Sequence, residues 1–225
     1  MSSAVEVIAR PKSATGLFRR PLLFGGLLAL ALYAGLTAYS SGHQYMPFDV
    51  SVERSVQSVS SAPATQMFLA FDWLDGIRQD IGGVAVVLLL IAVNWRSAAL
   101  VVTAAAGTTL VYYVTEQALK RPRPTPGLVH VVRHTGDYSF PSGHVAFFSW
   151  SLVLLVVCLA VGRLSRPLVV TAWVVAALVL LAVCIGRIYL GEHWPSDVIA
   201  GLALGLGWTA LALSFKPLSK PVLER

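Results

Sequence analysis

The segment "LVVTAWVVAALVLLAVCIGRIYLGEHWPSD", residues 168–197, joins a long apolar run to a cluster of charged and titratable residues. Its first part, residues 168–186, contains no charged side chain, and a membrane-spanning helix needs about 20 mostly apolar residues. The second part, residues 187–197, contains an arginine, a glutamate, a histidine and an aspartate. Charged groups beside hydrocarbon are costly unless they pair or face a wet cavity. We therefore expect residues 168–186 to cross a membrane and residues 187–197 to belong to a functional site.

The whole chain has the composition of a membrane protein. Of its 225 residues, 56% are hydrophobic and 12% are charged, whereas soluble domains contain about 25% charged residues. Five apolar runs are long enough to span a bilayer, and a shorter sixth can be extended by the residues before it. The five are residues 21–39, 97–119, 145–161, 168–186 and 198–215, and the sixth is 81–95. The sequence thus predicts an all-α fold, in which a polytopic membrane protein forms a bundle of six transmembrane helices.

The distribution of charge predicts how these helices are oriented in a plasma membrane. If six spans start from a cytoplasmic N-terminus, the cytoplasmic segments hold ten of the 17 basic residues and two of the 11 acidic residues. Basic residues gather on the cytoplasmic side of membrane proteins. We therefore expect cytoplasmic tails over 1–20 and 216–225, and a single transmembrane domain over 21–215. Nucleic-acid binding is not expected, since no loop combines clustered basic residues with aromatic ones.

In this orientation the loops 120–144 and 187–197 lie on the extracytoplasmic side, together with the outer segment 40–80. Apolar residues recur at helical spacing in the outer segment, which predicts one or two amphipathic helices along the membrane surface. These residues are Val52, Val56, Val59, Met67, Phe68, Phe71 and Leu74. The alternative is a solvated linker.

The first loop begins with "LKRPRPTPG", residues 119–127. Its prolines end the preceding helix and stiffen the chain, while Lys120, Arg121 and Arg123 gather positive charge. Ordinary contact with lipid headgroups is one explanation of this charge. However, the charge opposes the positive-inside bias, which favours a role in binding an anion.

The same loop ends in "SFPSGHVAFF", residues 139–148. Ser142 is a typical N-cap residue, and the free N–H groups of a helix start can bind an anion that Gly143 allows to approach closely. His144 lies in the first turn of the predicted helix, where it is either a structural histidine or a group that transfers protons.

In the second loop, Pro195 suits the first turn of the last span, which places His193 just before the helix. Asp197 either offsets the helix dipole or holds one ring nitrogen of His193 and leaves the other free to attack. The guanidinium of Arg187 can bind two phosphate oxygens at once. Cations, free N–H groups and two histidines on one membrane face suit phosphoryl transfer, in which one histidine attacks and the other protonates the leaving oxygen.

These stretches resemble the signature of the type 2 phosphatidic acid phosphatase family, whose superfamily includes vanadium haloperoxidases. The pattern is Lys-x6-Arg-Pro, then Pro-Ser-Gly-His, then Ser-Arg-x5-His-x3-Asp. Residues 141–144 match the second motif completely, and the third is present with Gly186 at the usual serine. The first motif keeps Arg123 but has Glu116 at the lysine position, and Lys120 is a candidate substitute.

The resemblance implies a metal-independent lipid phosphatase that needs no cofactor. It implies that His193 is the nucleophile and forms a phosphohistidine, that Asp197 orients it, and that His144 is the general acid. The residues expected to bind the substrate phosphate are Arg123, Ser142, Gly143 and Arg187, together with Lys120 as the substitute.

Several functions are compatible with this pattern. The expected one is hydrolysis of a lipid phosphate, such as polyprenyl diphosphate, phosphatidic acid or phosphatidylglycerol phosphate, and a lipid phosphotransferase is the alternative. An anion transporter would place charged residues at mid-span, where these spans have almost none. A zinc site at His130 and His134 would need further ligands at suitable spacing, which the neighbouring sequence lacks.

Overall fold

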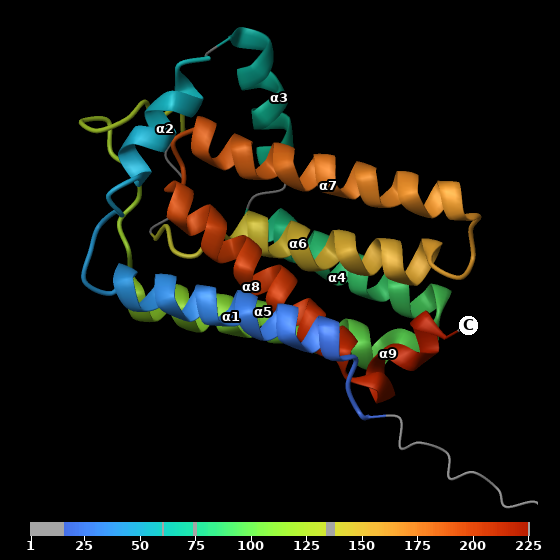
Figure 1. The fold of residues 1–225 in the computed structure, drawn as a ribbon. Helices are drawn as coiled ribbons and strands as arrows, with labels where there is room; N and C mark the ends of the chain where they lie inside the picture. The colour runs from blue at the N-terminus through green and yellow to red at the C-terminus, as the bar shows by residue number, and fades with distance from the viewer. Residues whose placement is uncertain (1–15, 60, 74–75, 134–137, 225) are drawn as a thin grey trace, which may run out of the picture.

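The computed structural model describes residues 16–59, 61–73, 76–133 and 138–224, most of which form helices arranged as a bundle (Figure 1). The α-helices are α1 (Arg20–Ser40), α2 (Asp49–Gln57), α3 (Ala62–Asp72), α4 (Ile77–Val93), α5 (Ala98–Leu119), α6 (Gly143–Leu155), α7 (Arg166–Tyr189), α8 (Pro195–Ser214) and α9 (Lys216–Leu223). A short 3₁₀ helix, η1 (Trp95–Ser97), precedes α5, and a π-helical turn, η2 (Val156–Ala160), extends α6. Over this part of the chain the expected all-α fold is confirmed.

Five helical segments are long and apolar enough to cross a membrane, and they coincide with the five long apolar runs of the sequence. They are Arg20–Ser40, Trp95–Leu119, Gly143–Ala160, Arg166–Tyr189 and Pro195–Ser214. The expected sixth span is α4, which has 17 residues. This corresponds to about 25 Å of helix, against a hydrocarbon core of about 30 Å. The six-span topology therefore stays a prediction.

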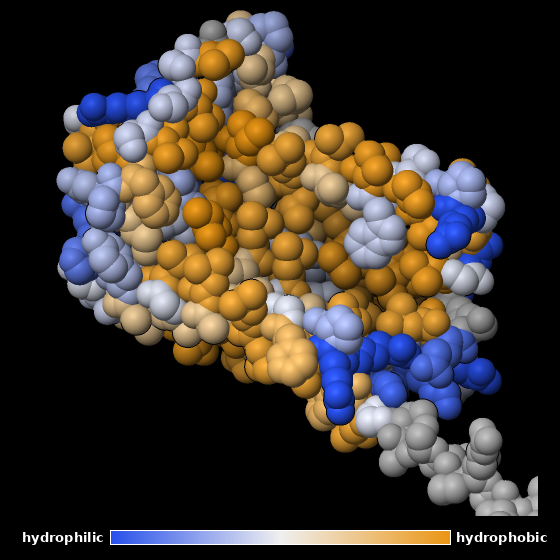
Figure 2. Space-filling model, in the orientation of Figure 1, coloured by the Kyte–Doolittle hydropathy of each residue, from blue (hydrophilic) through white to orange (hydrophobic). Residues whose placement is uncertain are grey.

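The outer surface of the bundle is apolar where lipid would cover it. Figure 2 shows a broad hydrophobic band across the middle of the molecule, between hydrophilic residues at its two ends. Large hydrophobic side chains of the long helices, such as Leu28, Leu88, Leu110 and Leu178, are more than half exposed. Exposed apolar surface of this extent is unfavourable in water and favourable in a bilayer. The chain is therefore a multi-pass membrane protein.

Helices α6 and α8 form the centre of the bundle. In their apolar windows 67% of the residues are buried, compared with 11% in α1 and α7. Helix α1 lies along α8, and α5 and α7 pack on other sides of this central pair (Figure 1). The two central helices therefore have the most fixed positions, and both begin at the same end of the molecule.

Glycines allow the backbones of α6 and α8 to approach closely. A Cβ atom on Gly201 would lie 2.6 Å from the backbone oxygen of Ser142, and one on Gly205 would lie 2.5 Å from Cβ of Ser149. Small residues at helix contacts are typical of membrane bundles. Gly201 and Gly205 therefore serve the packing of α8 on α6.

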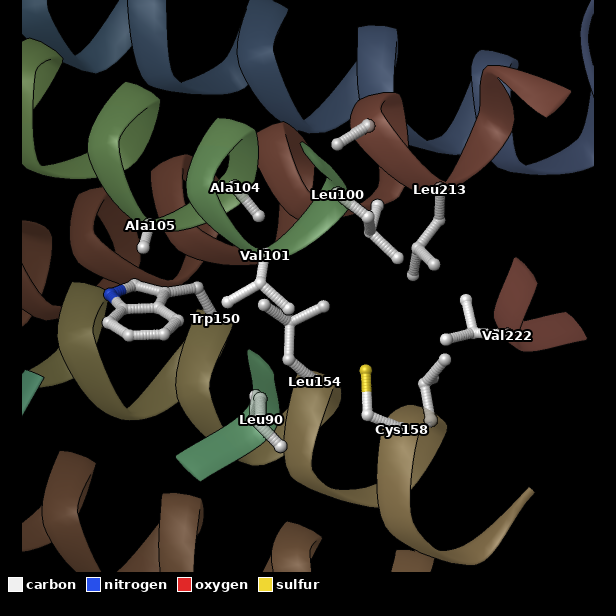
Figure 3. Packing of buried hydrophobic residues seen from close by; sticks show 12 residues of the cluster. Leu90, Leu100, Val101, Ala104, Ala105, Trp150, Leu154, Cys158, Leu213 and Val222 are labelled. Atoms are coloured by element: carbon white, nitrogen blue, oxygen red, sulfur yellow. The ribbon is translucent and has the colours of Figure 1, made fainter. Parts of the chain in front are cut away.

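At the opposite end of the bundle, a second packing centre joins α4, α5, α6, α8 and α9. Leu90, Leu100, Trp150, Leu154 and Val222 are among its buried side chains (Figure 3). The C-terminal segment expected as a tail is thus a short helix, α9, that docks on the bundle. An ion pair of 2.6 Å between Arg19 and Glu224 also ties this helix to the start of α1.

The outer segment contains two helices, α2 and α3, and the most buried residues of α2 are polar. Val52 and Val59 are exposed, and the buried residues of α2 are Asp49 and Glu53. The carboxylate of Asp49 accepts hydrogen bonds from the start of α8, which pulls this polar face inward. Val56 of the same helix packs against the cluster of Phe68, Tyr189 and Leu190. The amphipathic helices along the membrane surface stay a prediction.

Helix α3 packs on α7 through Phe68, which is buried with Tyr189 and Leu190. A Cβ atom on Gly186 would lie 2.9 Å from the Phe68 ring. The glycine at the position where the family pattern has serine therefore makes room for this aromatic side chain. Of the other residues expected on this helix, Met67 is exposed, while Leu74 and the side chain of Phe71 lie outside the described part.

Replacing Gly201 with alanine is expected to destabilise the protein. The added methyl group would overlap the Ser142 carbonyl, so α8 would have to move away from α6. Overpacking of this kind lowers the free energy of unfolding by about 1–3 kcal/mol. Thermal unfolding in detergent checks this, with Gly25→Ala as the control because nothing lies within 4 Å of a Cβ atom at Gly25. Equal unfolding temperatures for the two variants would contradict the packing role of Gly201.

Candidate active site

A polar cavity of about 90 Å³ lies at the end of the bundle where α6 and α8 begin. It is bounded by the start of α4, the last turns of α5, the loop after α5, the first turn of α6 and the loop before α8. The residues that line it are Gly76, Gln79, Asp80, Tyr112, Tyr113, Arg123, Gly143, His144, Glu192 and His193. The volume has room for several waters or for a phosphoryl group. The loop after α5, the start of α6 and the loop before α8, which contain the three sequence motifs, thus meet at one cavity.

His193 is held with one ring nitrogen facing the protein and the other facing the cavity side. Its Nδ1 lies 2.7 Å from the backbone oxygen of Ser139, so Nδ1 carries the proton and donates it to this carbonyl. Its Nε2 lies 3.4 Å from Nη1 of Arg123 and carries the lone pair. Burial, with the charges of Arg123 and Arg187, holds the pKa of His193 well below its usual value. The imidazole is therefore neutral near pH 7 and can act as a nucleophile.

The residue that orients His193 differs from the expected one. Asp197 was expected to hold a ring nitrogen of His193, but its Oδ2 lies 4.0 Å from Nδ1, beyond hydrogen-bond distance. This carboxylate instead accepts the backbone N–H of Trp194 at 2.9 Å and pairs with Arg121. The side chain of Asp197 thus interacts with the N-terminus of α8, the helix to which it belongs. The acceptor for Nδ1 of His193 is instead the carbonyl oxygen of Ser139.

The two arginines of the expected phosphate site lie on either side of Glu192. Arg123 lines the cavity, and its Nη1 donates to the backbone oxygen of Glu192 at 2.8 Å. Its Nε is buried and has no hydrogen-bond partner among the described residues. Arg187 is buried behind the cavity wall, where its Nη1 donates to Oε2 of Glu192 at 2.7 Å. Arg123 is thus placed to contact an anion directly, whereas Arg187 acts on the site through its charge and through Glu192.

The start of α6 brings the Pro-Ser-Gly-His motif to the cavity. Ser142 is the N-cap residue as expected, but its side chain makes no capping hydrogen bond. Its Oγ is buried without a hydrogen-bond partner among the described residues, while its N–H donates to the backbone oxygen of Asp197 at 3.0 Å. Gly143 and His144 line the cavity. The first turn of α6 thus points its free N–H groups toward the cavity end of the bundle.

Lys120 and Glu116 lie outside the cavity lining. Lys120 ends α5, is exposed, and holds its Nζ 5.9 Å from the centre of the Tyr138 ring. Glu116 accepts a hydrogen bond of 2.7 Å from the hydroxyl group of Tyr112, which does line the cavity. The position expected to hold a lysine is therefore connected to the cavity through Tyr112. The geometry gives Lys120 no contact with the cavity wall.

Several residues of the cavity were not singled out from the sequence. Asp80 lies near the start of α4, where it accepts a hydrogen bond of 3.2 Å from the hydroxyl group of Tyr113. Tyr112 and Tyr113 lie near the end of α5, and Glu192 lies in the loop quoted above. The sequence feature that could have identified these four residues is that each has a polar side chain near the end of an apolar run. Ser139 contacts His193 from behind the cavity, and Asp49 contacts Arg121 and Ser196 deeper in the protein. Neither residue has a local signal of this kind.

Among the residues that the structure describes, no three histidine, cysteine or acidic side chains gather in a way that could hold a metal ion. His134, one of the two histidines considered for zinc, lies outside the described residues. His130 lies on the surface near α2, where its backbone N–H donates to Gln57 at 2.9 Å.

The fold and the cavity define a class of protein: a helical multi-pass membrane protein with two histidines and an arginine around a polar cavity at one end of its bundle. Residues 95–220 match the model of the PAP2 superfamily. The chain belongs to this superfamily, which confirms the resemblance found in the three motifs.

Curated relatives match about two-fifths of this chain. An undecaprenyl-diphosphatase of Sulfolobus acidocaldarius is 34% identical over 93 residues, which cover 41% of this chain and 35% of the relative. The bacitracin transport permease protein BcrC of Bacillus licheniformis is 37% identical over 97 residues, covering 40% of this chain and 42% of the relative. The matched part thus spans less than half the length of each of these relatives.

Solved structures share the fold over most of the chain. A transmembrane PAP2-type phosphatidylglycerolphosphate phosphatase from Bacillus subtilis has a TM-score of 0.62 and 20% identity, covering 86% of this chain and 94% of that one. LpxE from Aquifex aeolicus has a TM-score of 0.58 and 20% identity, covering 75% of this chain and 96% of that one. At this level of identity the likeness shows a common fold.

The ring of His193 is expected to titrate well below pH 6.5, because burial and the Arg123 charge disfavour its protonated form. Arg123→Gln removes one of these charges, so the pKa should rise. Histidine ¹⁵N NMR across pH, with His193→Ala for assignment, measures both values. Arg54→Gln is the control, since Arg54 is exposed and its Nε donates to the backbone oxygen of Leu128 at 2.8 Å. Titration near pH 6.5 in the unmodified protein would contradict this description of the site.

Proposed function

We propose that this protein is a membrane-embedded lipid phosphatase that hydrolyses a phosphate monoester or diphosphate through a phosphohistidine on His193. The observation that carries the proposal is the continuity between the polar cavity and an apolar groove. The groove has a volume of about 490 Å³ and lies among α4, α5 and α6. It shares Gln79, Asp80, Tyr112, Tyr113 and Gly143 with the polar cavity.

The shared wall suits a substrate with one charged end and one apolar end. The remaining lining of the groove is mostly aliphatic and aromatic, with Val84, Leu88, Phe147 and Trp150 among its residues. A phosphate bound beside His144 and His193 would leave an attached hydrocarbon chain next to this lining. An apolar lining of this kind accommodates a hydrocarbon chain without exposing it to water or to unpaired polar groups. This supports a lipid phosphate rather than a water-soluble phosphate ester as the substrate.

The reaction follows from the positions of the two histidines. Nε2 of His193 attacks the phosphorus, so a P–N bond forms while the bond to the leaving oxygen breaks. His144 donates a proton to that oxygen, and it then removes a proton from the water that attacks the phosphohistidine. This second step releases orthophosphate and restores the neutral imidazole of His193. Both steps balance with the groups of His193, His144 and one water molecule.

Positive charge and N–H groups would stabilise the transferred phosphoryl group. Arg123 reaches the cavity directly, and the first turn of α6 adds the N–H groups near Ser142 and Gly143. Arg187 adds a buried charge within electrostatic range of His193. The neutral state of His193 supports its role as nucleophile, and the hydrogen bond to Ser139 keeps its lone pair on Nε2.

The proposed orientation places the cavity on the extracytoplasmic side. The start of α1 and helix α9 lie at the end of the bundle opposite the starts of α6 and α8 (Figure 1). The basic residues at that end belong to the start of α1, to η1, to the turn before α7 and to α9, and Figure 2 shows the hydrophilic surface there. The positive-inside rule assigns such an end to the cytoplasm.

Purified protein in detergent is expected to release phosphate from at least one of polyprenyl diphosphate, phosphatidic acid and phosphatidylglycerol phosphate. His193→Ala should lower this rate about 10³-fold or more, because the nucleophile is lost. His43→Ala is the control, since His43 is exposed and stacks on Tyr39 away from the cavity. EDTA should leave the rate unchanged.

Substantial activity in His193→Ala would refute the phosphohistidine route, and loss of activity with EDTA would indicate a metal enzyme. Transfer of labelled phosphate to a second lipid, without release, would identify a lipid phosphotransferase.

Filling the groove should weaken the binding of long-chain substrates. Gly83 lines the groove, and a Cβ atom there would lie 3.6 Å from Phe147, so Gly83→Phe would occupy its interior. We expect KM for a long-chain lipid phosphate to rise about tenfold, equal to about 1.4 kcal/mol of lost apolar contact. Turnover of p-nitrophenyl phosphate should not change. Gly82→Phe is the control because Gly82 is not part of the groove lining, and equal effects of both variants would contradict the assignment.

A further inference from the structure

Arg121 is buried at the centre of a polar network behind the cavity. It is 1% exposed, and its guanidinium pairs with the carboxylates of both Asp49 and Asp197. It also donates to Oγ of Ser196 at 2.9 Å and to the backbone oxygen of Gln44 at 3.0 Å. Burying an arginine is costly unless its donors are satisfied by good partners. This arginine therefore requires the parts of the chain that surround it to stay in place.

Asp49 brings helix α2 into this network. Its Oδ1 accepts the backbone N–H of Ser196 at 2.8 Å, and its Oδ2 accepts the hydroxyl group of Ser196 at 2.7 Å. The N–H of Ser196 is one of the free donors at the start of α8. Oδ2 also receives the Arg121 guanidinium at 3.1 Å. One carboxylate from α2 thus fixes both the arginine and the first turn of α8.

The same network reaches both sides of His193. The backbone oxygen of Arg121 accepts the N–H of Ser139 at 2.9 Å, and the oxygen of Ser139 accepts Nδ1 of His193 at 2.7 Å. On the other side, Asp197 pairs with Arg121 and accepts the N–H of Trp194, the residue after His193, at 2.9 Å. The acceptor of the ring proton and the backbone that carries the ring are therefore both tied to Arg121.

We propose that Asp49 and Arg121 are positioning residues that set the orientation of the His193 ring, so that helix α2 is a structural part of the active site. This inference rests on the proposed function of His193 as the nucleophile. Asp49 lies outside residues 95–220, which match the family model. The chain before the matched region thus contributes directly to the geometry of the site.

A role in positioning explains this network better than a role in stability alone. Replacing a buried ion pair with apolar residues is often neutral or stabilising, so such pairs are weak evidence for stability. Glu53, one turn further along α2, is buried, and its carboxyl oxygens have no hydrogen-bond partner among the described residues. Burial, with the charges of Asp197 and Asp49, raises its pKa to about 9. Glu53 is thus neutral at pH 7, and Asp49 is the acid of α2 that binds Arg121.

The test compares Asp49→Asn with Arg54→Gln, a change on the same helix that removes a contact outside the network. A displacement of about 1 Å at a reacting group can lower the rate about 100-fold. We expect Asp49→Asn to lower kcat by about this factor with KM changed less than about threefold, and to shift the His193 ring signals in ¹⁵N NMR. Arg54→Gln should change neither. Arg121→Lys should act like Asp49→Asn, since lysine keeps the charge but cannot bridge two carboxylates in the same way.

Two results would overturn the inference. One is an unchanged kcat together with unchanged His193 signals in Asp49→Asn. The other is a loss of kcat that parallels a lower unfolding temperature while the His193 signals stay the same, which would indicate a purely structural role. If the unmodified protein released phosphate from no lipid, the proposed function would fail, and the NMR comparison would still decide whether Asp49 orients His193.

Discussion

The close contact between the backbones of α6 and α8 is the constraint on which the site depends. Gly201 of α8 lies against the carbonyl of Ser142, and the N–H of Ser142 donates to the carbonyl of Asp197 at 3.0 Å. The two helix starts are therefore joined side by side through main-chain atoms. His144 follows the first of these starts and His193 precedes the second, so both reach one cavity. A side chain at position 201 would separate them, so a glycine that does not itself line the cavity fixes the geometry of the cavity.

The arrangement of buried charge supports the same site. Arg187 is paired with Glu192, and Arg121 is paired with Asp49 and Asp197, so the charges behind the cavity wall are largely compensated. Arg123 has its Nε buried without a hydrogen-bond partner among the described residues. In a weakly polar environment, such a group interacts strongly with an anion that enters the cavity. The structure thus separates the paired charges behind the cavity wall from the charge of Arg123, which faces the cavity.

Much of the site was predictable because its chemistry is concentrated in short stretches. The apolar runs, the proline that begins α8 and the Pro-Ser-Gly-His motif depend on neighbouring residues, and the structure places Arg123, Gly143, His144 and His193 at one cavity. Residues whose role depends on distant partners were assigned less well. Asp197 was expected to orient His193, but it interacts with Arg121 and the start of its own helix. Lys120 was expected near the phosphate, yet the left-handed turn at the end of α5 leaves it exposed.

The sequence by itself determined that this chain is helical, that it spans a membrane and that it carries the motifs of the PAP2 superfamily, because hydrophobicity and motif spacing are local properties. Only the tertiary structure decided which groups orient His193, how the apolar groove joins the polar cavity, and that α2 buries Asp49 and Glu53 while Val52 is exposed. These features depend on contacts between segments that are far apart along the chain. The buried guanidinium of Arg121 makes the difference plain, since its partners Asp49 and Asp197 come from α2 and α8 and meet only after the bundle has formed.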